Sequence, residues 1–257
     1  MLKLLLALLV LLPISAHALN IPKENAIYRG TPVAPGGQGW KSTAKLSIGG
    51  GICTGVFIAH DLILTAAHCG DSAPWVDLEV TLFFENSEVA TQLVIPQGQY
   101  KFYPHPEYVA DYTNKKDTND LALIVLKGET LPADFIPAEF FTSADASPPA
   151  IAYLVGAGLT HQGEVSSRLY FTKGSIDGYL EGDLMRIRTV PGQGLCKGDS
   201  GSPVFKPVGT ALKLTAISVS VTFNLNKECG SIVYATYITQ ERYDWIMLAA
   251  EEGRAAE

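Results

Sequence analysis

Short runs of β-branched and aromatic residues constrain the fold of this chain more than any other feature. Eight such runs follow one another from about position 45 onward, and Gly, Pro, Asn and Asp separate them. They cover Gly55–Leu64, Val76–Phe84, Ala90–Val94, Leu121–Leu126, Ala150–Val155, Met185–Val190, Lys213–Val221 and Ser231–Thr236. The pattern predicts an all-β sandwich or barrel. Periodicity alone does not decide between one barrel and two.

Helical periodicity is convincing only near the end of the chain. Thr239 is a suitable N-cap, and Glu241 falls in the first turn that would follow it. Trp245, Ile246 and Leu248 are predicted to lie on one side of this helix. The sequence contains no internal repeat, low-complexity tract or Ser/Gly-rich linker that would divide it. We therefore expect one helix packed on a β body.

The amino-terminal segment has the pattern of a secretory signal peptide. A cationic start at Lys3 precedes nine apolar residues, Leu4–Leu12, and a small-x-small sequence ends at Ala18. A membrane-spanning helix needs roughly 20 apolar residues, and no segment of the sequence approaches that length. We predict that residues 1–18 are removed and that the protein is secreted to an extracellular or periplasmic space.

The composition excludes several classes of partner and cofactor. Acidic residues outnumber basic residues by 26 to 19, which gives a net charge of −7, so nucleic acid is not expected as a partner. The sequence has no His-Glu-x-x-His, Cys-x-x-Cys or Asp-rich loop, so we expect no metal and no cofactor. Four cysteines are an even number, which suits two disulfides in an exported chain.

Two short motifs carry candidate chemistry that is ambiguous when each is taken alone. An apolar run ends at His68, directly before Cys69, and a single histidine at such a place is more often structural than catalytic. Asp120 directly precedes the apolar run Leu121–Val125. A carboxylate buried there needs a partner, because burying it unpaired is costly. A turn-forming aspartate that caps a loop is the alternative for Asp120.

A third motif, Gly198-Asp199-Ser200-Gly201, is more specific. Its glycines let the backbone bend so that a serine hydroxyl stands clear and backbone N–H groups point at one spot. A serine needs a base such as histidine to act as a nucleophile at neutral pH, and the base needs a carboxylate that orients it. The three motifs supply one residue of each kind, Ser200, His68 and Asp120.

Together these motifs resemble the trypsin/chymotrypsin family of serine endopeptidases. Ala66–Cys69, Asp120–Leu123 and Gly198–Gly201 follow one another in the family's order, and the resemblance extends from about Ile27 to Trp245. It implies two six-stranded antiparallel Greek-key barrels followed by a C-terminal helix. It also implies a monomer that acts on protein or peptide substrates and that meets a protein inhibitor or an activating protease.

The resemblance assigns a role to each residue of the three motifs. Ser200 Oγ would attack the scissile carbonyl, His68 would accept and return the proton, and Asp120 would orient His68. The N–H groups of Gly198 and Ser200 would form the oxyanion hole. Ser218 corresponds to the family serine that supports the aspartate and lends backbone to the substrate strand, with an ordinary strand serine as the alternative.

The cysteines also match the family. Cys53 and Cys69 correspond to the bridge that anchors the histidine loop. Cys196 and Cys229 correspond to the bridge beside the specificity pocket. All four cysteines are then used in two disulfides.

The resemblance further implies activation by proteolysis. A new amino terminus at Ile27 would pair with Asp199 and shape the oxyanion hole, because a buried ammonium and a buried carboxylate persist only together. Residues 19–26 would then be a propeptide, and residues 27–257 would form the protease domain. Tyr28 and Arg29 depart from the family's usual start, Ile-Val-Gly-Gly.

Four residues are implied at the specificity pocket: Gly194, Ser218, Ser220 and Ile232. Gly194 stands where trypsins that cleave after Arg or Lys carry Asp. Ser220 and Ile232 stand where members with an open pocket keep Gly. We expect a narrow, uncharged pocket that prefers Ala or Val, as in elastases.

Ser202 replaces the family's usual second glycine after the nucleophile, and its larger side chain is expected to weaken activity if it shifts the neighbouring backbone.

Two other functions remain open. A catalytically weak or silent homologue would act as a binding protein, although no residue of the triad is lost here. A serine hydrolase of esters is the second alternative, but such enzymes more often carry Gly-x-Ser-x-Gly at a strand-to-helix elbow of an α/β fold.

Overall fold

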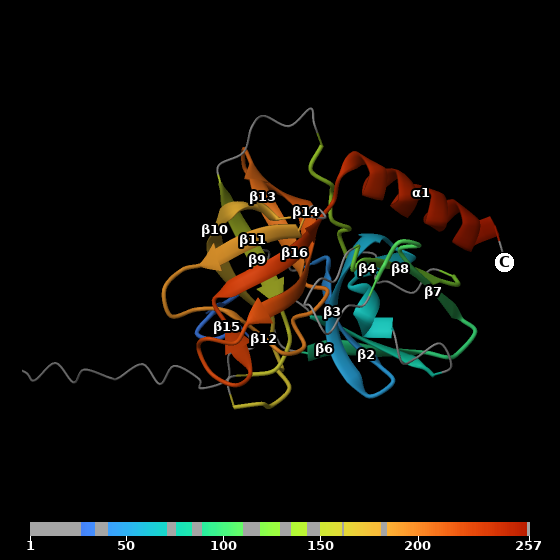
Figure 1. The fold of residues 1–257 in the computed structure, drawn as a ribbon. Helices are drawn as coiled ribbons and strands as arrows, with labels where there is room; N and C mark the ends of the chain where they lie inside the picture. Colours follow the sequence, from blue (N-terminus) through green and yellow to red (C-terminus); the bar gives the residue numbers. More distant parts are fainter. Residues whose placement is uncertain are drawn as a thin grey trace, which may run out of the picture.

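The computed structural model describes residues 27–33, 41–70, 76–83, 89–109, 119–128, 135–142, 150–160, 162–180 and 184–255. Two large antiparallel sheets and one long α-helix make up most of this part of the chain (Figure 1). The expected signal peptide, residues 1–18, and the expected propeptide, residues 19–26, lie outside the described residues.

The first sheet has seven strands in the order β6-β5-β2-β3-β4-β8-β7. Their bounds are β2 Thr43–Ile48, β3 Gly51–Ala59, β4 Leu62–Thr65, β5 Leu78–Phe83, β6 Val89–Ile95, β7 Tyr100–Pro104 and β8 Ala122–Leu126. β6 and β7 lie at opposite ends of this order but are consecutive in the chain. The sheet therefore curls into a half-barrel.

The second sheet closes into a barrel. Its strands are β1 Thr31–Pro32, β9 Ile151–Gly156, β10 Tyr170–Leu180, β11 Leu184–Thr189, β13 Pro203–Val208, β14 Ala211–Thr222 and β16 Ile232–Tyr237. β9 pairs with both β13 and β10, so six strands form a ring and β1 is added at the edge of β10. A separate short ladder joins β12, Leu195–Cys196, to β15, Cys229–Gly230.

The predicted all-β class, with two barrel-like units and one helix near the end, is confirmed. The predicted run Gly55–Leu64 is two strands, β3 and β4, because the polar pair His60-Asp61 forms the turn between them. Strands β2, β7, β10 and β13 were not among the predicted runs. In β10 and β13, Lys, Gly or Pro residues stand between the apolar residues. They obscure the alternation of apolar and polar residues that is typical of a strand.

The core has three parts that follow from this architecture. One cluster fills the inside of the first sheet, and another fills the closed barrel. The third lies between the two sheets and the helix, and it contains Leu64, Leu121, Phe205, Ile217 and Ile246. The surfaces that meet between the two units are therefore apolar, and the chain segments that cross this region are held by packing from both sides.

Helix α1, Gln240–Ala255, begins where the cap residue predicts. Thr239 Oγ1 accepts a hydrogen bond from the Arg242 N–H at 3.3 Å. Ile246 is fully buried, whereas Leu248 is 64% exposed, so the prediction that Leu248 shares the packed side was wrong. The buried positions follow the pattern i, i+4, i+7, i+8 and i+11 of one helix face: Arg242, Ile246, Ala249, Ala250 and Gly253.

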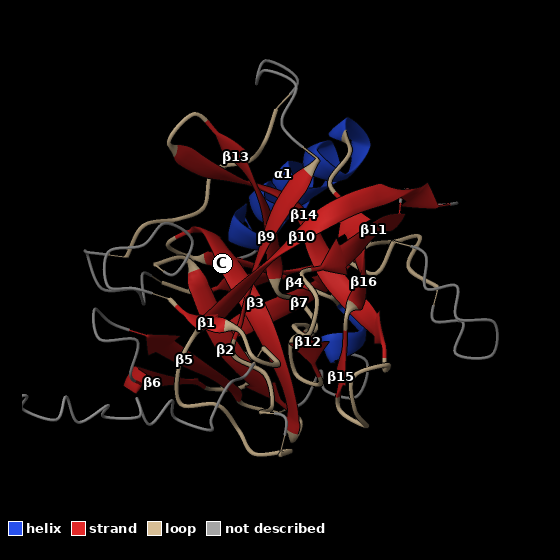
Figure 2. Ribbon diagram, turned by 90° about the vertical axis from the view of Figure 1, so that its left-hand side faces the viewer, coloured by secondary structure: helices blue, strands red, loops and turns tan. Residues whose placement is uncertain are grey.

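Figure 1 shows this helix beside β8 of the first sheet, which it contacts, and Figure 2 shows the helix in blue among the red strands. A Cβ atom added to Gly253 would lie 2.6 Å from a methyl group of Val125 in β8. In the described part of the chain, no helix is long and apolar enough to cross a membrane.

Ile246→Ala is expected to lower the free energy of unfolding by about 2–5 kcal/mol, because it leaves a cavity between the helix and both sheets. Leu248→Ala, on the exposed side of the same helix turn, is expected to change it by no more than about 0.5 kcal/mol. Urea denaturation of both variants measures the difference. Equal losses of stability would contradict the assignment of the packed face.

Candidate active site

The pairing of two strands brings His68 and Asp120 together. His68 lies in the short 3₁₀ helix Ala67–Gly70 that follows β4, and Asp120 directly precedes β8. β4 and β8 are neighbours, with Thr65 opposite Ala122, so both side chains emerge at the same end of this ladder. Residues 52 positions apart in the sequence are thus adjacent in space.

Asp120 holds His68 through two hydrogen bonds. His68 Nδ1 lies 2.7 Å from Asp120 Oδ2, and the His68 backbone N–H donates to Oδ1 at 3.0 Å. The Asp120 side chain is fully buried, whereas the His68 side chain is 24% exposed. With the carboxylate accepting from Nδ1–H, the other ring nitrogen, Nε2, is left as the proton acceptor.

The segment around Ser200 is a tight turn that requires two glycines. Gly198 and Gly201 have φ angles of +86° and +83°, which L side chains rarely adopt. A Cβ at Gly201 would lie 2.0 Å from the Thr54 carbonyl oxygen and 2.2 Å from Thr65 Oγ1. The turn therefore approaches the first sheet more closely than any other residue type would allow.

Hydrogen bonds tie this turn to the strands that deliver His68. The Thr54 N–H donates to the Ser200 carbonyl at 2.7 Å, and Thr54 Oγ1 donates to the Gly198 carbonyl at 3.0 Å. The structure has disulfides between Cys53 and Cys69 and between Cys196 and Cys229, the pairs that the resemblance implies. The first disulfide joins the residues adjacent to Thr54 and His68.

Among the residues that the structure describes, no group accepts a hydrogen bond from the backbone N–H groups of Gly198 and Ser200. Two backbone donors are thus available beside the serine.

Asp199 is buried beneath this turn. Its carboxylate oxygens accept hydrogen bonds at 2.8 Å from the N–H groups of Gly158 and Cys196. Burial raises the pKa of Asp199 from 3.8 to about 7, although both N–H donors favour the charged form. A Cβ at Gly156 would lie 2.1 Å from Asp199 Oδ1 and 3.0 Å from Ser202 Oγ, so these two oxygens share one small buried space.

Ile27 is held by burial and Tyr28 by backbone hydrogen bonds, whereas the Asp199 carboxylate accepts its hydrogen bonds from the N–H groups of Gly158 and Cys196. Ile27 is fully buried in the core of the closed barrel. Tyr28 pairs with Gly194, with hydrogen bonds of 2.8 Å and 3.3 Å in the two directions. The segment that begins at Ile27 is therefore attached beside the chain that leads into the Ser200 turn.

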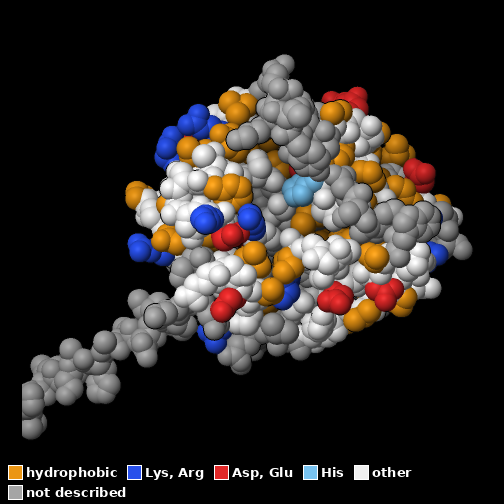
Figure 3. All heavy atoms as spheres, turned by 60° about the horizontal axis from the view of Figure 1, so that its bottom comes forward, with side chains coloured by type: hydrophobic (Ala, Val, Ile, Leu, Met, Phe, Trp, Pro, Cys, Tyr) orange, Lys and Arg blue, Asp and Glu red, His pale blue; other side chains and the backbone are white. Residues whose placement is uncertain are grey.

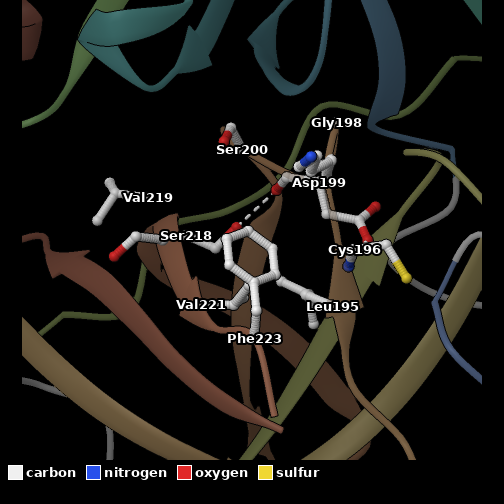
Figure 4. Close-up of a pocket in the computed structure, with 11 residues that line it drawn as sticks. Leu195, Cys196, Gly198, Asp199, Ser200, Ser218, Val219, Val221 and Phe223 are labelled. Carbon is white, nitrogen blue, oxygen red and sulfur yellow. Dashed lines mark hydrogen bonds between the residues drawn. The ribbon is translucent and has the colours of Figure 1, made fainter. Parts of the chain in front are cut away.

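A cavity of about 190 Å³ opens next to Ser200 (Figure 4). Ser218 and Ser220 are among the residues that line it. The resemblance assigns Ser218 to the support of Asp120, but Ser218 Oγ donates its hydrogen bond to the Asp199 carbonyl at 2.8 Å. Gly194 and Ile232, also predicted at the pocket, do not line it. A Cβ at Gly194 would lie 2.1 Å from the Gly230 carbonyl oxygen, so the space there is already filled by backbone.

The cavity also has walls that the sequence did not indicate. Leu195, Val219, Val221 and Phe223 supply apolar surface, and Lys197 is also among the lining residues. Lys197 Nζ lies 3.0 Å from Glu228 and 5.9 Å from the centre of the Phe223 ring. Phe223 follows the pocket strand β14 by one residue, and no motif marks it.

The surroundings of His68 do not suit a metal ion. Cys53, Cys69 and His68 offer ligand atoms within 4.8 Å of one another, but both sulfur atoms are in a disulfide and cannot bind as thiolates. On the face shown in Figure 3, a histidine is visible among apolar and uncharged side chains, with acidic and basic residues interspersed around them.

The buried carboxyl group of Asp199 predicts a pH-dependent stability of the uncut chain. Its pKa is 3.8 in the unfolded chain and about 7 in the folded chain, so the folded chain binds the proton more tightly between these values. The free energy of unfolding should therefore fall by about 4 kcal/mol as pH rises from about 4 to about 7. Denaturation of uncut Ser200→Ala chain, with and without Asp199→Asn, measures this slope. A slope unchanged by Asp199→Asn would contradict the assignment.

Comparisons with known proteins agree with this geometry. The family model described as Trypsin matches residues 27–246. Ovochymase of Halocynthia roretzi is 27% identical over 216 residues, which cover 77% of this chain and 13% of ovochymase. Granzyme B(G,H) of Mus musculus is 41% identical over 80 residues, 30% of this chain and 28% of the granzyme. Brachyurin of Leptuca pugilator is 26% identical over 163 residues, 59% of this chain and 70% of brachyurin.

The matched region thus spans less than two thirds of the length of ovochymase and of the granzyme. The family model, in contrast, matches most of this chain in one continuous stretch that includes all three motifs. The chain belongs to the trypsin family.

Proposed function

We propose that the protein is a secreted serine endopeptidase in which His68, Asp120 and Ser200 act as a catalytic triad. The observation that carries the proposal is the pair of hydrogen bonds from His68 to the buried Asp120 carboxylate. They fix the ring in the tautomer that accepts a proton at Nε2, the form that a serine nucleophile requires. Two disulfides in a chain of this family are consistent with export.

The backbone around Ser200 supports an acyl-enzyme mechanism. Attack by Ser200 Oγ on a peptide carbonyl places a negative charge on the carbonyl oxygen, and the proton passes to His68 and then to the leaving amine. The available N–H groups of Gly198 and Ser200 would stabilise that charge, at about 3 kcal/mol per donor in comparable enzymes. Expulsion of the amine and attack by water would complete the hydrolysis.

We base the proposed preference for small aliphatic residues before the cleaved bond on the walls of the cavity beside Ser200. Leu195, Val219 and Val221 make much of this wall apolar. Lys197 is paired with Glu228, and Asp199 is 1% exposed and directs its carboxylate to backbone donors. We therefore do not expect Lys197 to favour acidic substrate residues or Asp199 to favour basic ones.

Two alternative functions predict different results when peptides and esters are tested as substrates. A silent homologue would bind a partner without turnover. An ester hydrolase would cleave esters but not peptides, and the β architecture around Ser200 does not provide the strand-to-helix elbow typical of such enzymes.

We expect peptide anilides with Ala or Val before the cleaved bond to be hydrolysed faster than those with Arg, Asp or Phe. Ser200→Ala should lower hydrolysis by at least about 10³-fold, because the nucleophile is lost. Initial rates on a peptide panel, with a matched ester of the Ala peptide, measure both effects. Faster cleavage after Arg than after Ala would refute the pocket assignment, and turnover of the ester alone would favour the hydrolase.

We further propose that cleavage before Ile27 activates the enzyme. The buried Asp199 carboxyl group would then gain an ammonium partner, which offsets the cost of its burial. Amino-terminal sequencing of active protein should therefore begin at Ile27. Full activity of a chain that begins at Leu19 would contradict activation by cleavage before Ile27.

A further inference from the structure

The residue before the candidate catalytic aspartate has an unusual backbone. Asn119 has a φ of +51°, and among the described residues other than glycine only Arg29 shares a positive φ. The Leu121 N–H donates to the Asn119 carbonyl at 2.7 Å, so Asp120 is the central residue of a tight turn. A residue with a Cβ is disfavoured in this region, although asparagine tolerates it better than most.

A buried arginine from the C-terminal helix holds this asparagine. Arg242 is 5% exposed, and its Nε and Nη2 atoms donate to Asn119 Oδ1 at 2.9 Å and 2.6 Å. Arg242 Nη1 donates to the Tyr237 carbonyl at 2.7 Å. The guanidinium group thus joins the end of β16 to the side chain of Asn119, and two donors that converge on Oδ1 fix the orientation of that side chain.

The same helix supports the other side of the turn. The His105 N–H donates to the Leu121 carbonyl at 2.8 Å, and the His105 ring packs on Trp245 of the helix with 4.7 Å between ring centres. Thr236 Oγ1, on β16, donates to the Asp120 carbonyl at 3.1 Å. Asp120 is therefore flanked by residues that α1 and β16 hold in place.

We infer that Arg242 is a positioning residue, which sets the Asp120 carboxylate against His68 by holding Asn119 in its left-handed backbone conformation. The inference rests on the proposed function of Asp120, and it adds that the C-terminal helix is part of the support of the triad. If Arg242 is lost, Asn119 relaxes toward negative φ, and the peptide unit that begins Asp120 rotates with it. The 2.7 Å contact between Asp120 Oδ2 and His68 Nδ1 then lengthens.

The first experiment compares Arg242→Gln with Arg254→Gln. Arg254 lies on the same helix, but its guanidinium pairs with Asp61 and not with Asn119. We expect Arg242→Gln to lower kcat about 10-fold and to leave KM within about twofold, because an error in aspartate position affects the transition state more than substrate binding. Arg254→Gln should leave both constants within about twofold of the unaltered enzyme. A change in KM alone, or equal effects of the two variants, would overturn the inference.

A second pair of variants separates backbone conformation from folding. Asn119→Gly and Asn119→Ala both remove the acceptor of Arg242, but only glycine adopts a positive φ without strain. We expect Asn119→Gly to retain about 5–10 times more kcat than Asn119→Ala at similar melting temperatures. Equal losses in the two variants would show that the backbone conformation is not what Arg242 maintains.

A spectroscopic measurement keeps the inference distinct from the proposed function. The proton on His68 Nδ1 should give a low-field ¹H resonance, which does not depend on turnover. It should shift or broaden in Arg242→Gln and return in the double variant with Asn119→Gly. A resonance unchanged in Arg242→Gln overturns the inference even if the enzyme is active. Absence of peptide cleavage by the unaltered protein would overturn only the proposed function, because the resonance still tests the role of Arg242.

Discussion

The burial of one carboxylate, that of Asp120, is the constraint on which the rest of the site depends. A buried carboxylate is tolerated only if hydrogen-bond donors replace the water it has lost. Here His68 provides a donor for each carboxylate oxygen, one from its ring and one from its backbone. The arrangement therefore determines the position of the histidine and its tautomer together.

Residues from both units and from the terminal helix meet around Asp120. Asp120 precedes β8 of the first sheet, but its carbonyl accepts a hydrogen bond from Thr236 of the second. The apolar cluster around it draws Leu121, Ile217 and Ile246 from the first sheet, the second sheet and the helix respectively. Ser200 reaches the same region because Thr54 of the first sheet binds its carbonyl. The site is thus assembled at a junction and not within one barrel.

A strand or a helix face can be predicted from the sequence when neighbouring residues determine it, and not when distant contacts do. Runs such as Leu121–Leu126 are strands because the sequence is apolar enough to be buried on both faces, and this is visible without tertiary context. β10 was not predicted because Lys173 and Asp177 interrupt it, and its partners β9 and β11 decide its structure. Leu248 was misplaced because a single apolar residue in a helix does not by itself define the packed face.

The same distinction applies to the site. Its three motifs could be found in the sequence because each is short and chemically distinctive. Phe223 at the cavity and the contact of Arg242 with Asn119, 123 residues away, depend on pairings that no short motif records. Gly194 and Ile232 were predicted at the pocket from the family resemblance, and neither is among the residues that line the cavity beside Ser200.

The central claim is that Ser200, His68 and Asp120 act as one unit, and covalent labelling tests it most directly. Intact-mass analysis would follow the reaction of a fluorophosphonate with the unaltered protein, Ser200→Ala and Asp120→Asn. The account predicts a single adduct on the unaltered protein, none on Ser200→Ala, and labelling of Asp120→Asn at least about 100-fold more slowly, because His68 then loses the partner that fixes its tautomer. Labelling of Asp120→Asn at the unaltered rate, or an adduct on Ser200→Ala, would contradict it.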